Sequence, residues 1–417
     1  MSDGPKAEAQ AALIVARCAA LARCTETPGA ICRTFLSPAM DEAHALLRAW
    51  AEQAGLTVRV DRAGNFVAST KAAEDAPRLL IGSHLDTVPN AGAYDGVLGV
   101  VLGLAIAEAR RECGVGMDVV GFSEEEGVRF GTPFIGSKAM VGELSAEMLA
   151  RRDGAGVTVQ EALDTFAKTR PDAVATGLPK GTRGYIELHI EQGPMLETEG
   201  LALGVVTAIA GQSGGAMTFV GRAGHAGTTM MTQRQDALAA AAEWIGRVEA
   251  IGRTTAGLVA TVGQISAEPN AVNVIAARTR CSLDVRHAED ACRVRALGEI
   301  VSAAEEIAVR RGVRCDWSEM HTQTAVPMGA GMTVMAELAV EQAGYPVRRL
   351  VSGAGHDAMV LAPHVASGMI FLRCPGGLSH HPDEAVLAED VAAAYLAGLN
   401  FLEEFERAWS AERRASA

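Results

Sequence analysis

The sequence has no excess of basic residues. Its 37 Lys and Arg residues stand against 50 Asp and Glu residues, which gives a net charge of −13. A surface of that sign repels a phosphate backbone and an anionic membrane, so we expect neither nucleic acid nor membrane as a partner. A small anionic substrate is still compatible, because a pocket needs only one or two local cations.

Long apolar runs and paired cysteines are also missing. The apolar stretch Val97–Ala107 is interrupted by Gly and is shorter than the roughly 20 residues of a membrane-spanning helix. The start, Met1–Gln10, lacks the basic and apolar regions of a secretory signal. The eight cysteines are dispersed without a CxxC pair, which is typical of reduced thiols. We therefore expect a cytoplasmic protein.

The composition is that of a folded chain with a large core. Hydrophobic residues make up 49% of its 417 residues and charged residues 21%, a balance that excludes disorder. No internal repeat or low-complexity segment interrupts the pattern. At roughly 100–200 residues per domain, this length allows two or three domains, of which we expect two.

The first two hundred residues alternate between helical and strand patterns, as in an open and mostly parallel α/β sheet. The expected helices are Ala7–Leu21 and Asp41–Ala54, and the expected strands are Thr57–Asp61, Leu79–Ser83, Met117–Phe122 and Tyr185–Ile190. Polar side chains follow these strands or lie near their ends. Because ligands bind at the carboxyl ends of strands in open α/β sheets, this placement indicates a catalytic sheet.

A second unit is predicted to begin after a Gly-rich turn at Gly211–Gly215. The pattern there is β-α-β-β-α-β, a small ferredoxin-like sandwich inserted into the chain. Its expected elements are Met217–Gly221, Arg234–Ala250, Gly257–Ile265, Thr279–Arg286, Asp290–Arg310 and Val313–Met320. The α/β pattern resumes after Pro327 and ends in the helix Glu389–Phe405. The predicted domains are therefore a catalytic domain at 1–212 and 327–417 and an inserted domain at 213–326.

Two groups of polar residues follow predicted strands. His84 and Asp86 lie two positions apart, and a carboxylate so placed can orient a metal-binding imidazole. On its own this pair is more often a surface His and a turn Asp. Next, Ser123 precedes three consecutive glutamates at the end of an apolar strand. One glutamate can bind metal while its neighbour acts as general base, although an ordinary charged loop is also possible, for Glu124 in particular.

His189 and His380 complete a set of candidate ligands. His189 lies in an alternating strand, where a His is more often a core residue, and His380 lies in a loop. The full set of three imidazoles and two carboxylates is suited to Zn²⁺, Mn²⁺ or Co²⁺, and consists of His84, Asp95, a Glu of the triplet, His189 and His380. One zinc ion that keeps a coordination position open for water needs fewer than five protein ligands. Five donors therefore favour two divalent ions that share one bridging carboxylate.

The ordered motifs resemble the dinuclear metal hydrolases of the aminoacylase and carboxypeptidase type, from about Arg33 through Phe401. Within that group the sequence is similar to the branch of allantoate amidohydrolase, N-carbamoyl-L-amino-acid hydrolase and β-ureidopropionase. The motifs that carry the resemblance are Gly82–Gly96, Glu125–Phe130, Glu187–Pro194, Gly224–Thr228, Asn273–Ile275, Asp284–Arg286, Ser352–Ala358 and Ser379–Glu384.

This resemblance implies a role for each matching residue. It makes Glu125 the general base, Asp86 the residue that supports His84, and Asp95 the bridging ligand. The implied metal ligands are His84, Asp95, Glu126, His189 and His380, and the implied substrate contacts are Asn273, Arg286, Gln192, Gln212 and His356. For Gln212 and His356 a structural role carries equal weight. The resemblance also makes the inserted domain a dimerisation and lid domain, from which His225 reaches into the partner subunit's active site to stabilise an oxyanion.

Within the branch, the stretches Gly204–Gln212 and Phe371–Gly377 are most similar to allantoate amidohydrolase. The resemblance therefore implies hydrolysis of a ureido C–N bond of allantoate to ureidoglycine, ammonia and carbon dioxide. The alternative is an N-carbamoyl-L-amino-acid hydrolase, or a β-ureidopropionase, which needs the same catalytic residues. A peptidase fits the motifs less well, and a non-catalytic binding protein would have lost the base or a ligand. Two departures, Thr229-Met230-Met231 and Ala276, replace a usual Pro and affect the shape of the pocket.

Overall fold

The computed structural model describes residues 4–73 and 76–416. The chain divides into two compact units. The first unit comprises residues up to Thr207, Met328–Leu350 and the segment from Ala354, and the second unit comprises Ala208–Pro327 and Val351–Gly353. Residues 1–3, 74–75 and 417 of the predicted catalytic domain lie outside the described residues.

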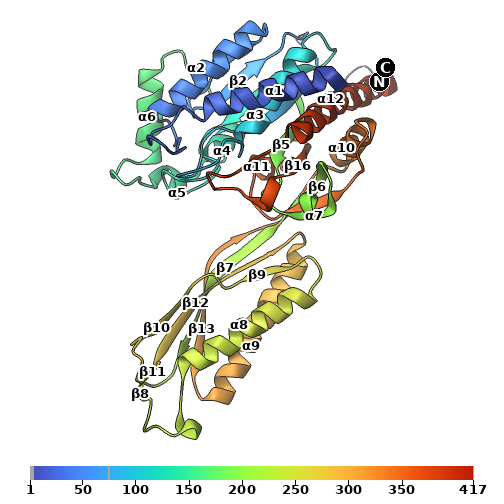
Figure 1. Ribbon diagram of the computed structural model, residues 1–417. Coiled ribbons are helices and arrows are strands. Elements are labelled where there is room, and N and C mark those ends of the chain that lie inside the picture. The colour runs from blue at the N-terminus through green and yellow to red at the C-terminus, as the bar shows by residue number, and fades with distance from the viewer. Residues whose placement is uncertain (1–3, 74–75, 417) are drawn as a thin grey trace. The chain divides into compact units, whose positions relative to one another are not determined.

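The first unit is built on a mixed sheet whose strand order is β1-β2-β4-β3-β5-β16-β6 (Figure 1). Strands β4, β3, β5 and β16 are parallel, whereas β2 joins β4 and β6 joins β16 in antiparallel fashion. The strands are β1 (Thr57–Val60), β2 (Phe66–Ser69), β3 (Arg78–His84), β4 (Gly116–Phe122), β5 (Thr182–Ile190), β6 (Leu203–Ile209), β15 (Arg349–Ser352) and β16 (Ser367–Leu372). The predicted α/β fold with a mostly parallel central sheet is confirmed.

Helices cover this sheet and share one hydrophobic core with it. Helix α3 has apolar residues around its whole circumference, which is typical of a helix buried on all sides. It packs on β3, β4 and β5. The helices of the first unit are α1 (Gly4–Leu21), α2 (Pro38–Gln53), α3 (Val97–Ala109), α4 (Ile135–Val141), α5 (Ala146–Ala150), α6 (Val159–Thr169), α7 (Met195–Glu199), α10 (Ala330–Gln342), α11 (Asp357–Leu361) and α12 (Ala388–Ser416). None of the helices within the described residues is both long and apolar enough to cross a membrane.

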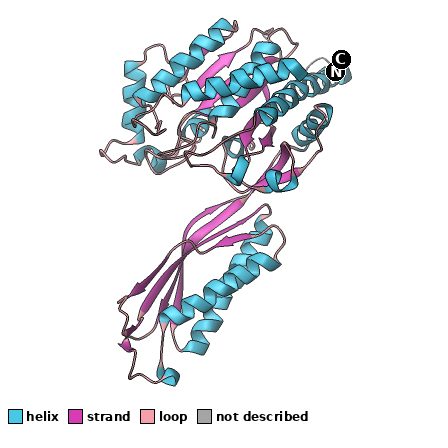
Figure 2. Cartoon of the chain, in the orientation of Figure 1, coloured by secondary structure: helices cyan, strands magenta, loops and turns pink. Residues whose placement is uncertain are grey.

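The second unit is an antiparallel sheet with two helices on one face (Figure 2). The strand order is β10-β12-β7-β13, with β9 also paired to β12, and a separate ribbon joins β8 to β11. Its elements are β7 (Gly211–Val220), β8 (Gly224–His225), α8 (Ala237–Thr254), β9 (Val259–Thr261), β10 (Ile265–Glu268), β11 (Val274–Ile275), β12 (Arg278–His287), α9 (Asp290–Arg311), β13 (Arg314–Gln323) and β14 (Val326–Pro327). Trp244 and Phe219 are central to the core between helices and sheet.

Two local predictions for this unit are wrong. The Gly-rich segment Gly211–Gly215 is not a turn but the first half of the central strand β7. Its glycines allow side chains of β13 to lie across the strand, because a Cβ at Gly214 would clash with the ring of His321 and a Cβ at Gly215 with Trp317. The predicted strand Gly257–Ile265 is split into β9 and β10, which pair with different parts of β12.

The second unit also includes a short segment that the sequence analysis placed in the catalytic domain. Residues Val351–Gly353 belong to it, and their main chain accepts hydrogen bonds from two of its residues. The amide of Ala210 donates a hydrogen bond to the carbonyl oxygen of Ser352 (2.9 Å), and Arg286 donates one to the carbonyl oxygen of Gly353 (2.6 Å). Such long-range pairing leaves no trace in local composition.

Candidate metal centre

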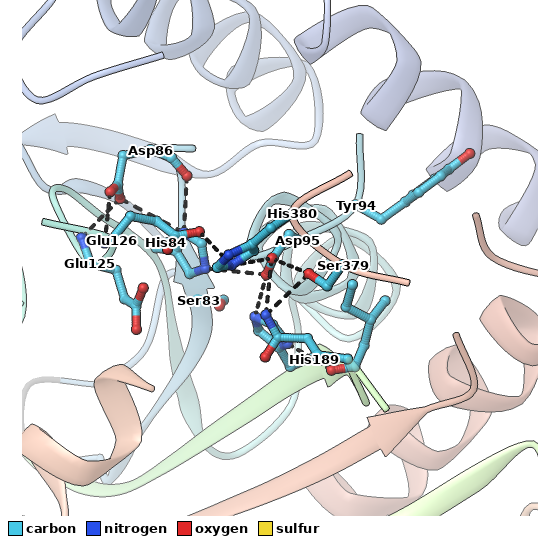
Figure 3. Close-up of polar contacts among 12 residues, drawn as sticks. Ser83, His84, Asp86, Tyr94, Asp95, Glu125, Glu126, His189, Ser379 and His380 are labelled. Atoms are coloured by element: carbon cyan, nitrogen blue, oxygen red, sulfur yellow. Dashed lines mark hydrogen bonds and ion pairs between the residues drawn. The ribbon is translucent and has the colours of Figure 1, made fainter. Parts of the chain in front are cut away.

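The five predicted metal ligands come together in the first unit at the carboxyl ends of the parallel strands (Figure 3). His84 is the last residue of β3, and His189 lies at the end of the neighbouring strand β5. Glu126 follows the fully buried strand β4, while Asp95 precedes α3 and His380 lies in the loop after β16. Parallel strands thus bring together residues almost 300 positions apart in the chain.

Asp95 is the common centre of this cluster. His189 Nε2 and His84 Nε2 lie 3.1 and 3.7 Å from Asp95 Oδ1, and His380 Nε2 lies 3.3 Å from Asp95 Oδ2. Glu126 Oε1 is 3.3 Å from the same His380 nitrogen. Two of the four groups of possible ligand atoms among the described residues share Asp95. This donor set fits two divalent ions bridged by one carboxylate.

Main-chain hydrogen bonds orient the two buried imidazoles. His84 Nδ1 lies 3.0 Å from the carbonyl oxygen of Asp86, and His189 Nδ1 lies 2.8 Å from that of Ile190. With Nδ1–H donating to a carbonyl, each Nε2 is directed toward Asp95, where it can bind a cation. The sequence analysis expected the carboxylate of Asp86 to orient His84, but Asp86 Oδ1 lies 3.7 Å from His84 Nδ1. The main-chain carbonyl of Asp86 is the partner of His84 instead.

The carboxylate of Asp86 has a different target. Its Oδ1 accepts a hydrogen bond from the amide of Glu125 and its Oδ2 one from the amide of Glu126, both at 3.0 Å. Asp86 is almost fully buried, with 1% of its surface exposed. One residue thus connects the end of β3 to the loop that carries the predicted base and a predicted ligand. Sequence spacing gave no sign of this contact.

Electrostatics make the cluster a site for cations. Burial lowers the pKa of His84, but Asp95 and the nearby carboxylates of Glu125 and Asp86 outweigh burial and raise it well above its usual value. Burial, together with the charge of Glu126, raises the pKa of Glu125 well above its usual value, although His84 opposes the shift. A carboxylate with a raised pKa accepts a proton readily, which is the property that a general base needs.

The first glutamate of the triplet is buried and is not part of an exposed charged loop. Glu124 has no exposed surface, and its Oε1 accepts hydrogen bonds from the amides of Arg129 (2.8 Å) and Phe130 (3.3 Å). Its backbone has a positive φ of 52°, and burial raises its pKa to about 8. Glu124 therefore holds the loop in shape behind its two neighbours.

Other side chains hold the bridging carboxylate. Gln192 Nε2 donates to Asp95 Oδ2 at 3.0 Å, and Ser379 Oγ donates to the same oxygen at 2.6 Å. Glu384 Oε1 accepts from the amides of Tyr94 and Asp95 at 2.8 and 3.0 Å. The sequence analysis named Gln192 as a substrate contact and omitted Ser379 and Glu384, although both lie in the motif Ser379–Glu384.

His356 lies behind the cluster. It is buried, and its ring stands edge-on to that of His189 with centroids 4.5 Å apart. Burial and the neighbouring His189 hold its pKa well below the usual value. A neutral ring packed against a predicted ligand is the structural role that the sequence analysis had kept open for His356.

The four remaining predicted residues lie in the second unit, at two places. His225 and Asn273 are exposed neighbours on the β8–β11 ribbon, where the amide of Ala226 donates to the carbonyl oxygen of Asn273 (2.9 Å). Gln212 and Arg286 are paired across β7 and β12 at the other end of the sheet. Asp284 contacts both of them.

Comparisons with known proteins agree with this site. Residues 80–405 match the model of Peptidase family M20/M25/M40. The chain is 38% identical over 426 residues to allantoate deiminase 1 of Glycine max, covering 93% of this chain and 88% of that protein. It is 40% identical over 371 residues to an N-carbamoyl-L-amino acid amidohydrolase of Geobacillus stearothermophilus, covering 87% and 90%.

Solved structures are similar over nearly the whole chain. An amidase of the hydantoinase/carbamoylase family from Burkholderia multivorans has a TM-score of 0.88 and 33% identity, covering 94% of this chain and 97% of that one. The resemblance expected from the ordered motifs is confirmed. Because the family match spans most of the sequence, the chain belongs to peptidase family M20/M25/M40.

Proposed function

We propose that the protein is a metal-dependent amidohydrolase that cleaves a ureido C–N bond of allantoate. The observation that carries the proposal is the placement of Asp95 between two sets of donors, with the buried carboxylate of Glu125 beside them. The relatives named allantoate deiminase, 36–38% identical to this chain, support allantoate as the substrate. The cytoplasmic location expected from the sequence stays a prediction.

The proposed ligands are His84, Asp95 and His189 for one ion and Asp95, Glu126 and His380 for the other. When bound, the two ions polarise the ureido carbonyl and lower the pKa of water in the site. Zinc and manganese, and also cobalt, suit this mixture of imidazole and carboxylate. Elemental analysis of the purified protein identifies the ions, and full activity of a preparation free of metal would refute the proposal.

Glu125 is the proposed general base. It takes a proton from the attacking water and returns it to the leaving nitrogen, so the C–N bond breaks and ammonia departs. The carbamate that remains loses carbon dioxide, and ureidoglycine is left. Arg286 and Asn273 are proposed to bind the substrate carboxylate, for which a guanidinium is suited by its planar pair of donors.

Exchanging the two neighbouring glutamates for glutamine separates the roles of base and ligand. Glu125→Gln should retain bound metal and lose several orders of magnitude in kcat, because an amide accepts no proton. Glu126→Gln should lower metal occupancy, measured by chelator competition. If the two variants show the opposite phenotypes, the assignment is shifted by one residue.

The second candidate is N-carbamoyl-L-amino-acid hydrolysis, which the relative from Geobacillus stearothermophilus favours at 40% identity. Both reactions release ammonia and use the same groups, so a substrate panel with ammonia as the readout distinguishes them. We expect a higher kcat/KM for allantoate. A tenfold preference for carbamoyl amino acids, about 1.4 kcal/mol in transition-state binding, would favour the second candidate.

His225 is proposed to act in the partner subunit of a homodimer formed through the second unit. The amide of Gly227 donates to His225 Nδ1 at 3.1 Å, so the ring proton resides on Nε2. That exposed N–H can donate to a developing oxyanion. His225 belongs to the second unit, whereas the proposed metal ligands belong to the first. This division supports action in trans.

Subunit exchange tests this arrangement. His225→Ala and Glu125→Gln should each be nearly inactive, but mixing them should regenerate activity because each heterodimer has one site with both groups. Random exchange of equal amounts gives about half heterodimers, so recovery should approach about a quarter of wild type. No recovery despite proven exchange would place His225 in its own subunit's site or outside the reaction.

A further inference from the structure

The guanidinium of Arg286 is held by a carboxylate that the proposed function does not use. Asp284 Oδ1 accepts from Arg286 Nε at 2.8 Å, and Asp284 Oδ2 accepts from Arg286 Nη2 at 3.2 Å. Two parallel hydrogen bonds fix the plane of the guanidinium as well as its position. The carbonyl oxygen of Gly353 accepts a third bond, from Nη1, at 2.6 Å.

The N–H groups of Arg286 that these contacts do not use indicate what kind of ligand it binds. A guanidinium carries five N–H groups, one on Nε and two on each Nη nitrogen. Among the described residues, the three contacts use one N–H from each nitrogen, which leaves one on Nη1 and one on Nη2. These two are donors of the kind that bind the two oxygens of a carboxylate. The side chain of Arg286 is 34% exposed, so a ligand can reach it.

Gln212 completes the support from the neighbouring strand. It lies directly opposite Arg286 in the pairing of β7 with β12, and its Nε2 donates a hydrogen bond to Asp284 Oδ2. The amide nitrogen of Gln212 is therefore directed to Asp284. Its main chain is held too, because Arg293 Nη1 donates to the carbonyl oxygen of Gln212 at 3.2 Å.

We propose that Asp284 is a positioning residue for substrate recognition, and that Gln212 acts through it. Asp284 orients Arg286 so that its two outer N–H groups meet the carboxylate of a small ureido acid. The Asp284–Arg286 pair is electrically neutral as a unit, so recognition depends on the geometry of the paired donors more than on net charge. The inference rests on the proposed function, in which Arg286 binds the substrate carboxylate.

The test compares two substrates that differ only in the carboxylate. Allantoate and methylenediurea share two ureido groups, but methylenediurea lacks the carboxylate; for an N-carbamoyl amino acid, the matching alkylurea has the same use. Asp284→Ala should raise KM for the acid about tenfold or more and leave kcat within about twofold, because it removes only binding orientation. The kcat/KM for the uncharged urea should not change.

Matched variants separate the possible outcomes. Thr261→Ala replaces an exposed residue paired with Asp284 on β9 and should leave both substrates unaffected. Gln212→Ala should raise KM for the acid less than Asp284→Ala does. Should Asp284→Ala fold poorly, Asp284→Asn keeps the shape but places an amide N–H₂ against the donors of Arg286 and Gln212, and it should still raise KM for the acid.

Failure of the inference is distinct from failure of the proposed function. If Arg286→Ala leaves KM for the acid unchanged, the carboxylate anchor itself is wrong. If Arg286→Ala raises this KM but Asp284→Ala and Asp284→Asn do not, the positioning role is refuted. An equal loss of kcat/KM for acid and urea in the Asp284 variants would also refute it, since it would show a merely structural role.

Discussion

The contacts of Asp86 predict a combined loss of stability and metal affinity when its carboxylate is removed. In Asp86→Ala, the amides of Glu125 and Glu126 lose their acceptors at 3.0 Å. A buried donor left without a partner costs about 1–3 kcal/mol, so the two amides together cost about 2–6 kcal/mol. Burial raises the pKa of Asp86, and removing a group that is costly to bury returns part of that sum. We therefore expect a net loss of about 2–4 kcal/mol.

Metal affinity should fall in the same variant. The loop that loses its anchor carries Glu126, and loss of a residue that orients ligands typically costs about 10–100-fold in affinity. Asp86→Asn should also lose affinity, because its amide group places one N–H₂ against a main-chain N–H.

Urea unfolding of the metal-free protein measures the stability, and chelator competition measures the affinity. Asp172→Ala and Asp172→Asn, at an exposed position of the same unit, are the controls. Asp86 variants that match these controls in both measurements would refute the role of Asp86 in holding the glutamate loop.

Three further predictions concern other parts of the first unit. Burial lowers the pKa of His44 to about 4, so the unfolded chain takes up a proton near pH 6.5 that the folded protein excludes; this linkage should lower stability by about 3 kcal/mol between pH 6.5 and 4, measured as the difference between the wild type and His44→Leu in urea unfolding of metal-free protein. Gly82→Ala would press a methyl group against the carbonyl oxygen of Val120 on β4 and should cost about 3 kcal/mol or more in thermal unfolding, with an unchanged melting curve as the contrary result. Glu384→Ala should weaken metal binding in chelator competition by freeing the loop before Asp95, and wild-type affinity would contradict that reasoning.

The sequence alone was sufficient to predict the central fold and to predict which candidate ligands would lie together at the sheet edge. A His or a Glu at the end of an apolar strand is visible in the chain order, and parallel strands necessarily bring their carboxyl ends to one edge of a sheet. The meeting of His84, the glutamate triplet and His189 is therefore predictable from the sequence. The β-α-β-β-α-β pattern of the second unit was readable for a similar reason, because helix and strand periodicities are local.

Only the tertiary structure decided what holds these residues in place. The carboxylate of Asp86 bonds to amides about 40 positions away, and the acceptor of the Asp95 amide is Glu384, at the other end of the chain. By composition, the glycines of β7 indicated a turn. They lie in a strand instead, and rings of β13 side chains pack directly against two of them, where a Cβ would clash. Periodicity and composition report on neighbours in the chain, whereas hydrogen-bond acceptors and close packing are supplied by whichever segment the fold brings near.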